Sequence, residues 1–148
     1  MIAAPHVKSN LNHADRKVII DRIVDRLKDS VDEFDAIAIS GYSMSLIGST
    51  VAHLLGKNLI LVRKSSDVRY SKLEVEGCPN QRYIIIDDMM ETGSTIKNVV
   101  NKIETLLFDC VCVAVGMYYS RLTSLGREFC QENISSTVRV IDLTERAT

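Results

Sequence analysis

Continuous apolar runs, separated by segments with helical spacing, most constrain how this chain can fold. The runs do not alternate with polar residues, and they are AIAIS (36–40), NLILV (58–62), RYIII (82–86), CVCVAVGM (110–117) and TVRVI (137–141). Strands buried on both faces have this pattern, which is typical of parallel sheets covered by helices. Between the runs, apolar residues recur every three or four positions, which predicts helices over 14–29, 46–55, 94–108 and 120–131.

This order predicts an α/β fold: a single doubly wound domain over residues 1–148, with a mainly parallel sheet of about five strands and flanking helices. Residues 1–12 are expected to be irregular, 41–45 to form a turn, and 63–80 to form a long loop. In such sheets ligands bind beyond the carboxyl ends of the strands, where the strand order reverses. The segments expected there are 40–45, 63–80, 87–95 and 117–121.

Composition argues against several classes of protein. A net charge of −1 gives no basic surface for nucleic acid or an anionic membrane as a partner. Apolar runs are too short to span a membrane, and the first residues, MIAAPHVKSN, lack the pattern of a secretory signal. The four cysteines show no zinc-ligand spacing. Reduced thiols without a signal predict a cytoplasmic protein.

The stretch IIIDDMMETGST (84–95) carries the densest group of functional side chains. Asp87 and Asp88 end an apolar run, and a Thr-Gly-Ser-Thr turn leads into a predicted helix. Free N–H groups at that helix start, Gly93 and three hydroxyls together predict a phosphate cradle. Carboxylates beside a phosphate fit a ribose 5-phosphate, whose hydroxyls or accompanying Mg²⁺ they would bind. The alternative is helix capping alone, worth about 1 kcal/mol.

This stretch resembles the phosphoribosyl pyrophosphate (PRPP) signature of type I phosphoribosyltransferases, in which two acidic residues and a T-G-x-T-like turn follow an apolar strand. The order of elements agrees over nearly the whole chain. The resemblance implies that Asp87 and Asp88 bind the ribose and Mg²⁺. It implies that the 5′-phosphate is bound by Glu91, Thr92, Gly93, Ser94 and Thr95.

Two further segments are similar to loops of the same family. The short loop Ser40, Gly41, Tyr42 and Ser43 resembles the pyrophosphate-binding loop, although a plain tight turn fits equally well. Leu-Val-Arg-Lys (61–64) resembles the V-R-K that precedes the flexible catalytic loop of adenine and orotate enzymes, here 65–77. The resemblance implies that Arg63, Lys64, Arg69 and Lys72 stabilise the leaving pyrophosphate. For Arg63 and Lys64 the alternative is a solvated strand end.

The implied reaction moves the phosphoribosyl group of PRPP to a ring nitrogen of a nucleobase and releases pyrophosphate. Glu91 stands where 6-oxopurine enzymes usually carry an Asp near the base, so it is interpreted either as a catalytic group facing the base or as an outward-facing loop residue. Glu91 slightly favours a purine, whereas V-R-K favours an orotate or adenine type. The hood that selects the base must be reduced, because only 1–12 and 117–130 remain to build it.

Tyr118 and Tyr119 follow the fourth apolar run, and either one stacks on the base or packs in the core, which is the default interpretation. Family members are commonly homodimers, so a homodimer is expected. The competing hypothesis is a PRPP-binding regulator that has lost catalysis. Arg63, Lys64 and the basic loop after them favour the enzyme, because sensing PRPP requires no closing loop.

Overall fold

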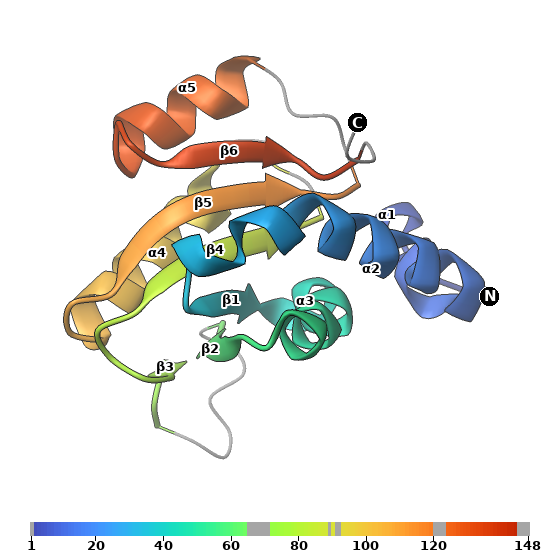
Figure 1. Ribbon diagram of the computed structural model, residues 1–148, viewed down its shortest axis with the longest axis horizontal. Helices are drawn as coiled ribbons and strands as arrows, with labels where there is room; N and C mark the ends of the chain where they lie inside the picture. The colour runs from blue at the N-terminus through green and yellow to red at the C-terminus, as the bar shows by residue number, and fades with distance from the viewer. Residues whose placement is uncertain (1, 65–71, 89, 91–92, 120–123, 145–148) are drawn as a thin grey trace.

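The computed structural model describes residues 2–64, 72–88, 90, 93–119 and 124–144 (Figure 1). In this part of the chain, six strands form one sheet in the order β3-β2-β1-β4-β5-β6. The strands are β1 (Ala36–Ser40), β2 (Asn58–Val62), β3 (Val75–Glu76), β4 (Arg82–Asp87), β5 (Val111–Met117) and β6 (Arg139–Asp142). All pairs are parallel except β2 with β3, which is antiparallel. The predicted doubly wound α/β fold is therefore confirmed, with one strand more than expected.

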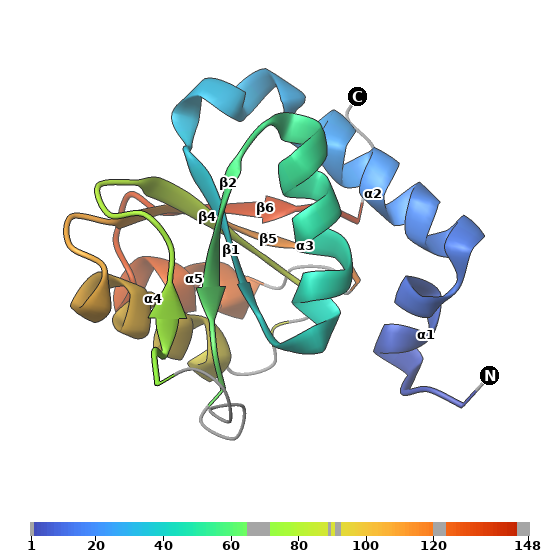
Figure 2. The ribbon, with the colours of Figure 1, turned by 90° about the horizontal axis from the view of Figure 1, so that it is seen from below.

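Helices cover both faces of the sheet. They are α1 (Pro5–Leu11), α2 (His13–Leu27), α3 (Gly41–Leu55), α4 (Ser94–Leu106) and α5 (Ser124–Asn133), with a 3-10 helix η1 (Lys28–Glu33) after α2. Helices α2 and α3 lie on one face, and α4 and α5 on the other (Figure 2). None of these described helices is long and apolar enough to cross a membrane.

The core explains why the apolar runs are continuous. Every residue of β1 is buried, because β1 lies between β2 and β4 and is covered on both faces. Five of the six residues of β4 are buried, and they end at Asp87. β1 pairs with β2 on one side and with β4 on the other, so the strand order reverses between β1 and β4. The carboxyl ends of these two strands define the expected ligand site.

Three predicted segments were assigned the wrong kind of structure. Residues 5–11 form α1, because Pro5 at the first helical position suits a helix start. The expected turn 41–45 is the first turn of α3, whose buried stripe already begins at Met44 and continues through Ile47, Gly48 and Val51. The loop expected over 63–80 contains β3, whose two residues pair with the end of β2 and are too few for a periodic signal.

Candidate active site

Two helices begin where the central strands end. Helix α3 starts at Gly41, directly after β1, and α4 starts after Gly93, a few residues beyond β4. Within the described residues, no side chain caps either helix start, and both glycines have φ of +73°. The backbone N–H groups of two first helical turns and the positive ends of two helix dipoles therefore face the carboxyl ends of the central strands. This is the arrangement that binds anions such as phosphates.

Asp87 and Asp88 lie beside these helix starts and are only 5% and 6% exposed. The Asp88 N–H donates to the Asp87 Oδ1 at 2.8 Å. The N–H groups of Tyr118 and Tyr119 donate to the carbonyls of Asp87 and Asp88 at 3.1 and 3.0 Å, which continues the β4–β5 ladder. Burial, and then the negative charge of Asp88, raises the pKa of Asp87 to about 7. The site therefore holds negative charge that a cation or hydroxyl donors of a ligand would stabilise.

Lys64 brings positive charge to the same place from the end of β2. A Cβ built on Gly41 would lie 3.0 Å from Lys64 Cε and 3.1 Å from Nζ, so the lysine side chain lies across the glycine. A larger residue at Gly41 would meet both this close contact and the left-handed φ. The positive charge of Lys64 also acts to lower the pKa of Asp87. Three predicted loops thus meet at Gly41, Lys64 and Asp87.

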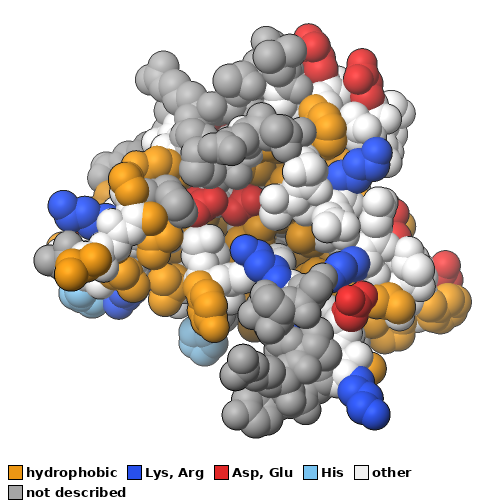
Figure 3. Space-filling view, turned by 180° about the vertical axis from the view of Figure 1, so that it is seen from behind, with side chains coloured by type: hydrophobic (Ala, Val, Ile, Leu, Met, Phe, Trp, Pro, Cys, Tyr) orange, Lys and Arg blue, Asp and Glu red, His pale blue; other side chains and the backbone are white. Residues whose placement is uncertain are grey.

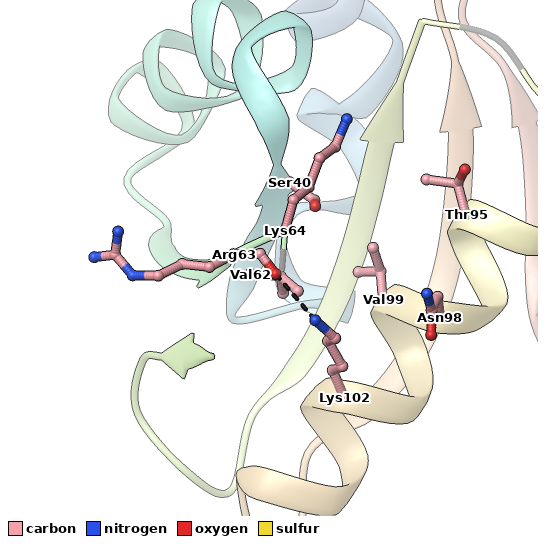
Figure 4. A pocket seen from close by; sticks show the side chains of 8 residues that line it. All are labelled: Ser40, Val62, Arg63, Lys64, Thr95, Asn98, Val99 and Lys102. Carbon is pink, nitrogen blue, oxygen red and sulfur yellow. Dashed lines mark hydrogen bonds between the residues drawn. The ribbon is translucent and has the colours of Figure 1, made fainter. Parts of the chain in front are cut away.

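A cavity of about 220 Å³ lies next to this cluster (Figure 4). It is lined by Ser40, Val62, Arg63, Lys64, Thr95, Asn98, Val99 and Lys102. Figure 4 shows residues from β1 and the end of β2 on one side and residues from α4 on the other. Asn98 and Lys102 were not predicted as site residues. Asn98 follows Thr95 by three residues and Lys102 follows Asn98 by four, so a polar stripe along α4 was the signal that could have found them.

The guanidinium of Arg63 does not join the cluster. Its Nη2 donates to Glu76 Oε2 at 2.8 Å, and Figure 4 shows the guanidinium pointing away from Lys64 and Thr95.

The other predicted site residues differ in their exposure and contacts. Tyr42 is 85% exposed at the start of α3, and the Ser43 carbonyl accepts a 3.4 Å hydrogen bond from the Tyr118 hydroxyl. Lys72 is exposed, as is Ser94 in the first turn of α4. Arg69, Glu91 and Thr92 lie outside the described residues.

The two tyrosines after β5 differ in their surroundings. Tyr118 is 1% exposed, and its hydroxyl accepts a 2.9 Å hydrogen bond from Asn10 Nδ2 of α1. It therefore packs in the core and ties α1 to the start of α3, as the default interpretation held. Tyr119 remains 43% exposed at the end of the ladder that carries Asp88. Figure 3, a space-filling view from behind the view of Figure 1, shows acidic and basic side chains close to one another on that side of the molecule.

Comparison with known proteins identifies the family, although no family model matches the chain. Adenine phosphoribosyltransferase of Caldicellulosiruptor saccharolyticus is 33% identical over 129 residues, which cover 76% of this chain and 71% of that protein. The enzyme of the same name from Clostridium tetani is 32% identical over 142 residues, covering 83% and 79%.

Solved structures agree on the fold. Adenine phosphoribosyltransferase from Saccharomyces cerevisiae has a TM-score of 0.68 at 21% identity, covering 89% of this chain and 80% of its own. Orotate phosphoribosyltransferase from Francisella tularensis has a TM-score of 0.69 at 15% identity, covering 90% and 68%. The adenine enzyme from Trypanosoma brucei, solved with AMP, pyrophosphate and ribose-5-phosphate, has a TM-score of 0.66 at 23% identity, covering 92% and 68%.

The chain belongs to the type I phosphoribosyltransferase family. The sequence relatives that establish this carry the name adenine phosphoribosyltransferase. The predicted family and fold are therefore confirmed, and so is the predicted class of function, enzymatic phosphoribosyl transfer to a nucleobase.

Proposed function

We propose that this enzyme transfers the phosphoribosyl group of PRPP to adenine and releases pyrophosphate. The observation that carries the proposal is the meeting of Gly41, Lys64 and Asp87 below two helix starts without side-chain caps. PRPP carries a 5′-phosphate and a pyrophosphate on one ribose, so it needs two anion sites with hydroxyl-binding groups between them. The names of the sequence relatives favour adenine as the base.

In the proposed complex, the start of α4 at Gly93, Ser94 and Thr95 binds the 5′-phosphate, together with Glu91 and Thr92. Asp87 and Asp88 accept hydrogen bonds from the ribose hydroxyls. The α3 start, from Ser40 to Ser43, donates its N–H groups to pyrophosphate.

Lys64 lies against that α3 start, so its ammonium stabilises charge on the leaving group. The base nitrogen forms its bond to C1 of the ribose as the bond from C1 to pyrophosphate oxygen breaks. The electron pair of the broken bond leaves with pyrophosphate, and the base loses its ring N–H proton. Arg63, Arg69 and Lys72 remain proposed partners of pyrophosphate, and Glu91 remains a proposed acid or base.

The residues present fit Mg²⁺. Asp87 and Asp88 offer adjacent buried carboxylates, and burial together with their mutual repulsion disfavours two unneutralised negative charges. No group of three or more His, Cys, Asp or Glu side chains that could hold a metal occurs among the described residues. One or two carboxylates plus substrate phosphates are a common way to hold this ion. Bound there, Mg²⁺ would neutralise charge on the departing pyrophosphate.

The remaining proposals concern the base site, assembly and location. Tyr119 is the tyrosine after β5 that stays accessible, so we assign it to contact the base in a hood reduced to the segments 1–12 and 117–130. A homodimer is proposed from the family. The four cysteines are free, which supports a reducing, cytoplasmic location.

The test is pyrophosphate release from PRPP and Mg²⁺ with adenine, guanine, hypoxanthine, xanthine, orotate and uracil in turn. Release with adenine alone is expected. Release with an oxopurine instead would contradict the adenine assignment and favour Glu91 facing the base. No release with any base, from a protein that still binds PRPP in calorimetry, would favour the non-catalytic regulator. Sedimentation in the same buffer tests the homodimer.

A further inference from the structure

Lys102 lies on the α4 side of the cavity, across from Lys64, and its ammonium contacts the protein. Its side chain, on the last part of α4, is only 20% exposed. The Nζ donates to the backbone carbonyl of Arg63 at 3.1 Å, as the dashed line in Figure 4 shows. The same Nζ lies 3.6 Å from Oε1 of Glu74. A partly buried lysine is thus held by one carbonyl and one carboxylate.

The two residues that Lys102 contacts, Arg63 and Glu74, lie at the two ends of the segment that connects β2 to β3. The Arg63 N–H donates to the Glu74 carbonyl at 2.8 Å, which extends the antiparallel pairing of β2 and β3 by one step. Arg63 and Glu74 are therefore the two positions from which the segment between β2 and β3 leaves the sheet. Lys102 contacts both, and it supplies a donor to the Arg63 carbonyl just before Lys64.

The Arg63 carbonyl belongs to the peptide that carries Lys64. The Arg63 carbonyl, the Lys64 N–H and the Lys64 Cα lie in one plane, so the orientation of this peptide fixes the point from which the Lys64 side chain starts. That side chain reaches Gly41, where its Cε and Nζ lie near 3 Å from a Cβ built on the glycine (3.0 and 3.1 Å). Rotation of this peptide would move the ammonium away from the α3 start and from Asp87.

We propose that Lys102 is a positioning residue that holds the Arg63–Lys64 peptide so that the Lys64 ammonium stays at the α3 start. The inference rests on the proposed function, because it takes that place as the binding site of the leaving pyrophosphate. Lys102 then acts on catalysis through Lys64 and need not touch the substrate. A misplacement of about 1 Å at a reacting group is sufficient to reduce turnover by about 100-fold.

The experiment is a double-mutant cycle with Lys64→Met, Lys102→Met and the double variant, together with Lys102→Arg. Turnover, KM for PRPP and adenine, and thermal unfolding are measured for each. Lys102→Met should lower kcat by about 10- to 100-fold with KM for adenine unchanged. Lys102→Arg should keep most of the kcat that Lys102→Met loses, because a guanidinium also donates to a carbonyl. In the Lys64→Met background, Lys102→Met should cause no further loss.

Lys57 provides the matched control. Its Nζ donates to the Val31 carbonyl at 2.5 Å, so Lys57→Met also removes a lysine–carbonyl hydrogen bond, near the amino ends of the strands. It should lower the unfolding temperature and leave kcat unchanged. Glu74→Gln removes the charge that Lys102 faces at Glu74 and keeps the hydrogen bond from Lys102 to the Arg63 carbonyl. This variant should therefore retain most of the activity.

Two results would overturn the proposal: a kcat of Lys102→Met equal to that of the unaltered enzyme, or an equal loss with and without Lys64. If Lys102→Met does not fold, Lys102→Gln, which keeps a donor, replaces it in the cycle. If the unaltered protein transfers no phosphoribosyl group to any base, the proposed function fails. The same cycle is then read from calorimetric binding of pyrophosphate with Mg²⁺, where coupling between Lys64 and Lys102 still supports or refutes the positioning role.

Discussion

Gly93→Ala should damage the site by two separable effects. Gly93 has φ of +73°, and a Cβ built on it would lie 2.3 Å from Phe129 Cδ1, far inside contact distance. The left-handed backbone costs an L-residue about 1–2 kcal/mol. Moving the Phe129 ring in a packed interface costs about 1–3 kcal/mol more. We therefore expect Gly93→Ala to lower the free energy of unfolding by about 2–5 kcal/mol.

Gly56 isolates the backbone effect. It ends α3 with φ of +65°, and nothing lies within 4 Å of a Cβ built there. Gly56→Ala therefore pays only the backbone strain, about 1–2 kcal/mol. Both substitutions lower the conformational entropy of the unfolded chain by a similar amount. This entropy contribution therefore cancels when the two variants are compared. The difference between them, about 1–3 kcal/mol, should measure the overlap with Phe129.

Urea unfolding of Gly93→Ala, Gly56→Ala, Phe129→Ala and the Gly93→Ala/Phe129→Ala pair supplies the four free energies. Phe129→Ala should cost clearly less in the Gly93→Ala background than alone, because it also removes the overlap. PRPP affinity should fall in Gly93→Ala and not in Gly56→Ala, since only Gly93 sets the start of α4. Equal stability of the two glycine variants would refute the reasoning.

Three more predictions concern the carboxylates and Tyr119. Asp88→Asn should weaken PRPP binding by about 10- to 100-fold in calorimetry, the loss of one hydrogen bond to a charged group, while the unfolding temperature barely changes. Burial raises the pKa of Asp87 from 3.8 to about 7, so without ligand and Mg²⁺ the free energy of unfolding should fall as pH rises from about 4 to about 8. Asp87→Asn should remove most of that fall in urea titrations at each pH. Tyr119→Ala should raise KM for adenine without changing KM for PRPP, and an unchanged KM for adenine would remove Tyr119 from the base site.

Much of the fold could be predicted, because a strand that is buried on both faces of the sheet appears in the sequence as a continuous apolar run. β1 and β2 have the predicted bounds, 36–40 and 58–62, since turn or polar residues flank each apolar run. β3 could not be predicted, because two residues form a strand only when β2 is already in place beside them. The start of α3 was missed for a related reason: Ser43 and Ser45 favour a turn locally, and burial of Met44 overrides them.

In the candidate site, too, features formed by neighbouring residues could be predicted, and contacts between distant residues could not. The positions of Asp87 at a strand end and of Gly93 before a helix were predictable, because an apolar run, an acidic pair and a glycine before a helical pattern are adjacent in sequence. The partner of Arg63 was not, since Glu76 reaches it only through the antiparallel turn back to β3. Lys102 is 39 residues from the carbonyl that it holds, and no local pattern encodes that contact.

Polar groups have different surroundings at the amino ends and at the carboxyl ends of the strands. Near the amino ends of the strands, Arg82 donates to both Asp35 carboxylate oxygens at 2.9 and 3.1 Å, and Lys57 donates to a carbonyl. At the carboxyl ends, within the described residues, α3 and α4 start without side-chain caps, and burial raises the pKa of Asp87. A ligand with phosphates and hydroxyls, accompanied by a cation, would satisfy all of these groups at once. PRPP with Mg²⁺ at 100 times its Kd should therefore stabilise the fold by about 2.7 kcal/mol, and an anion without a ribose at the same concentration by less.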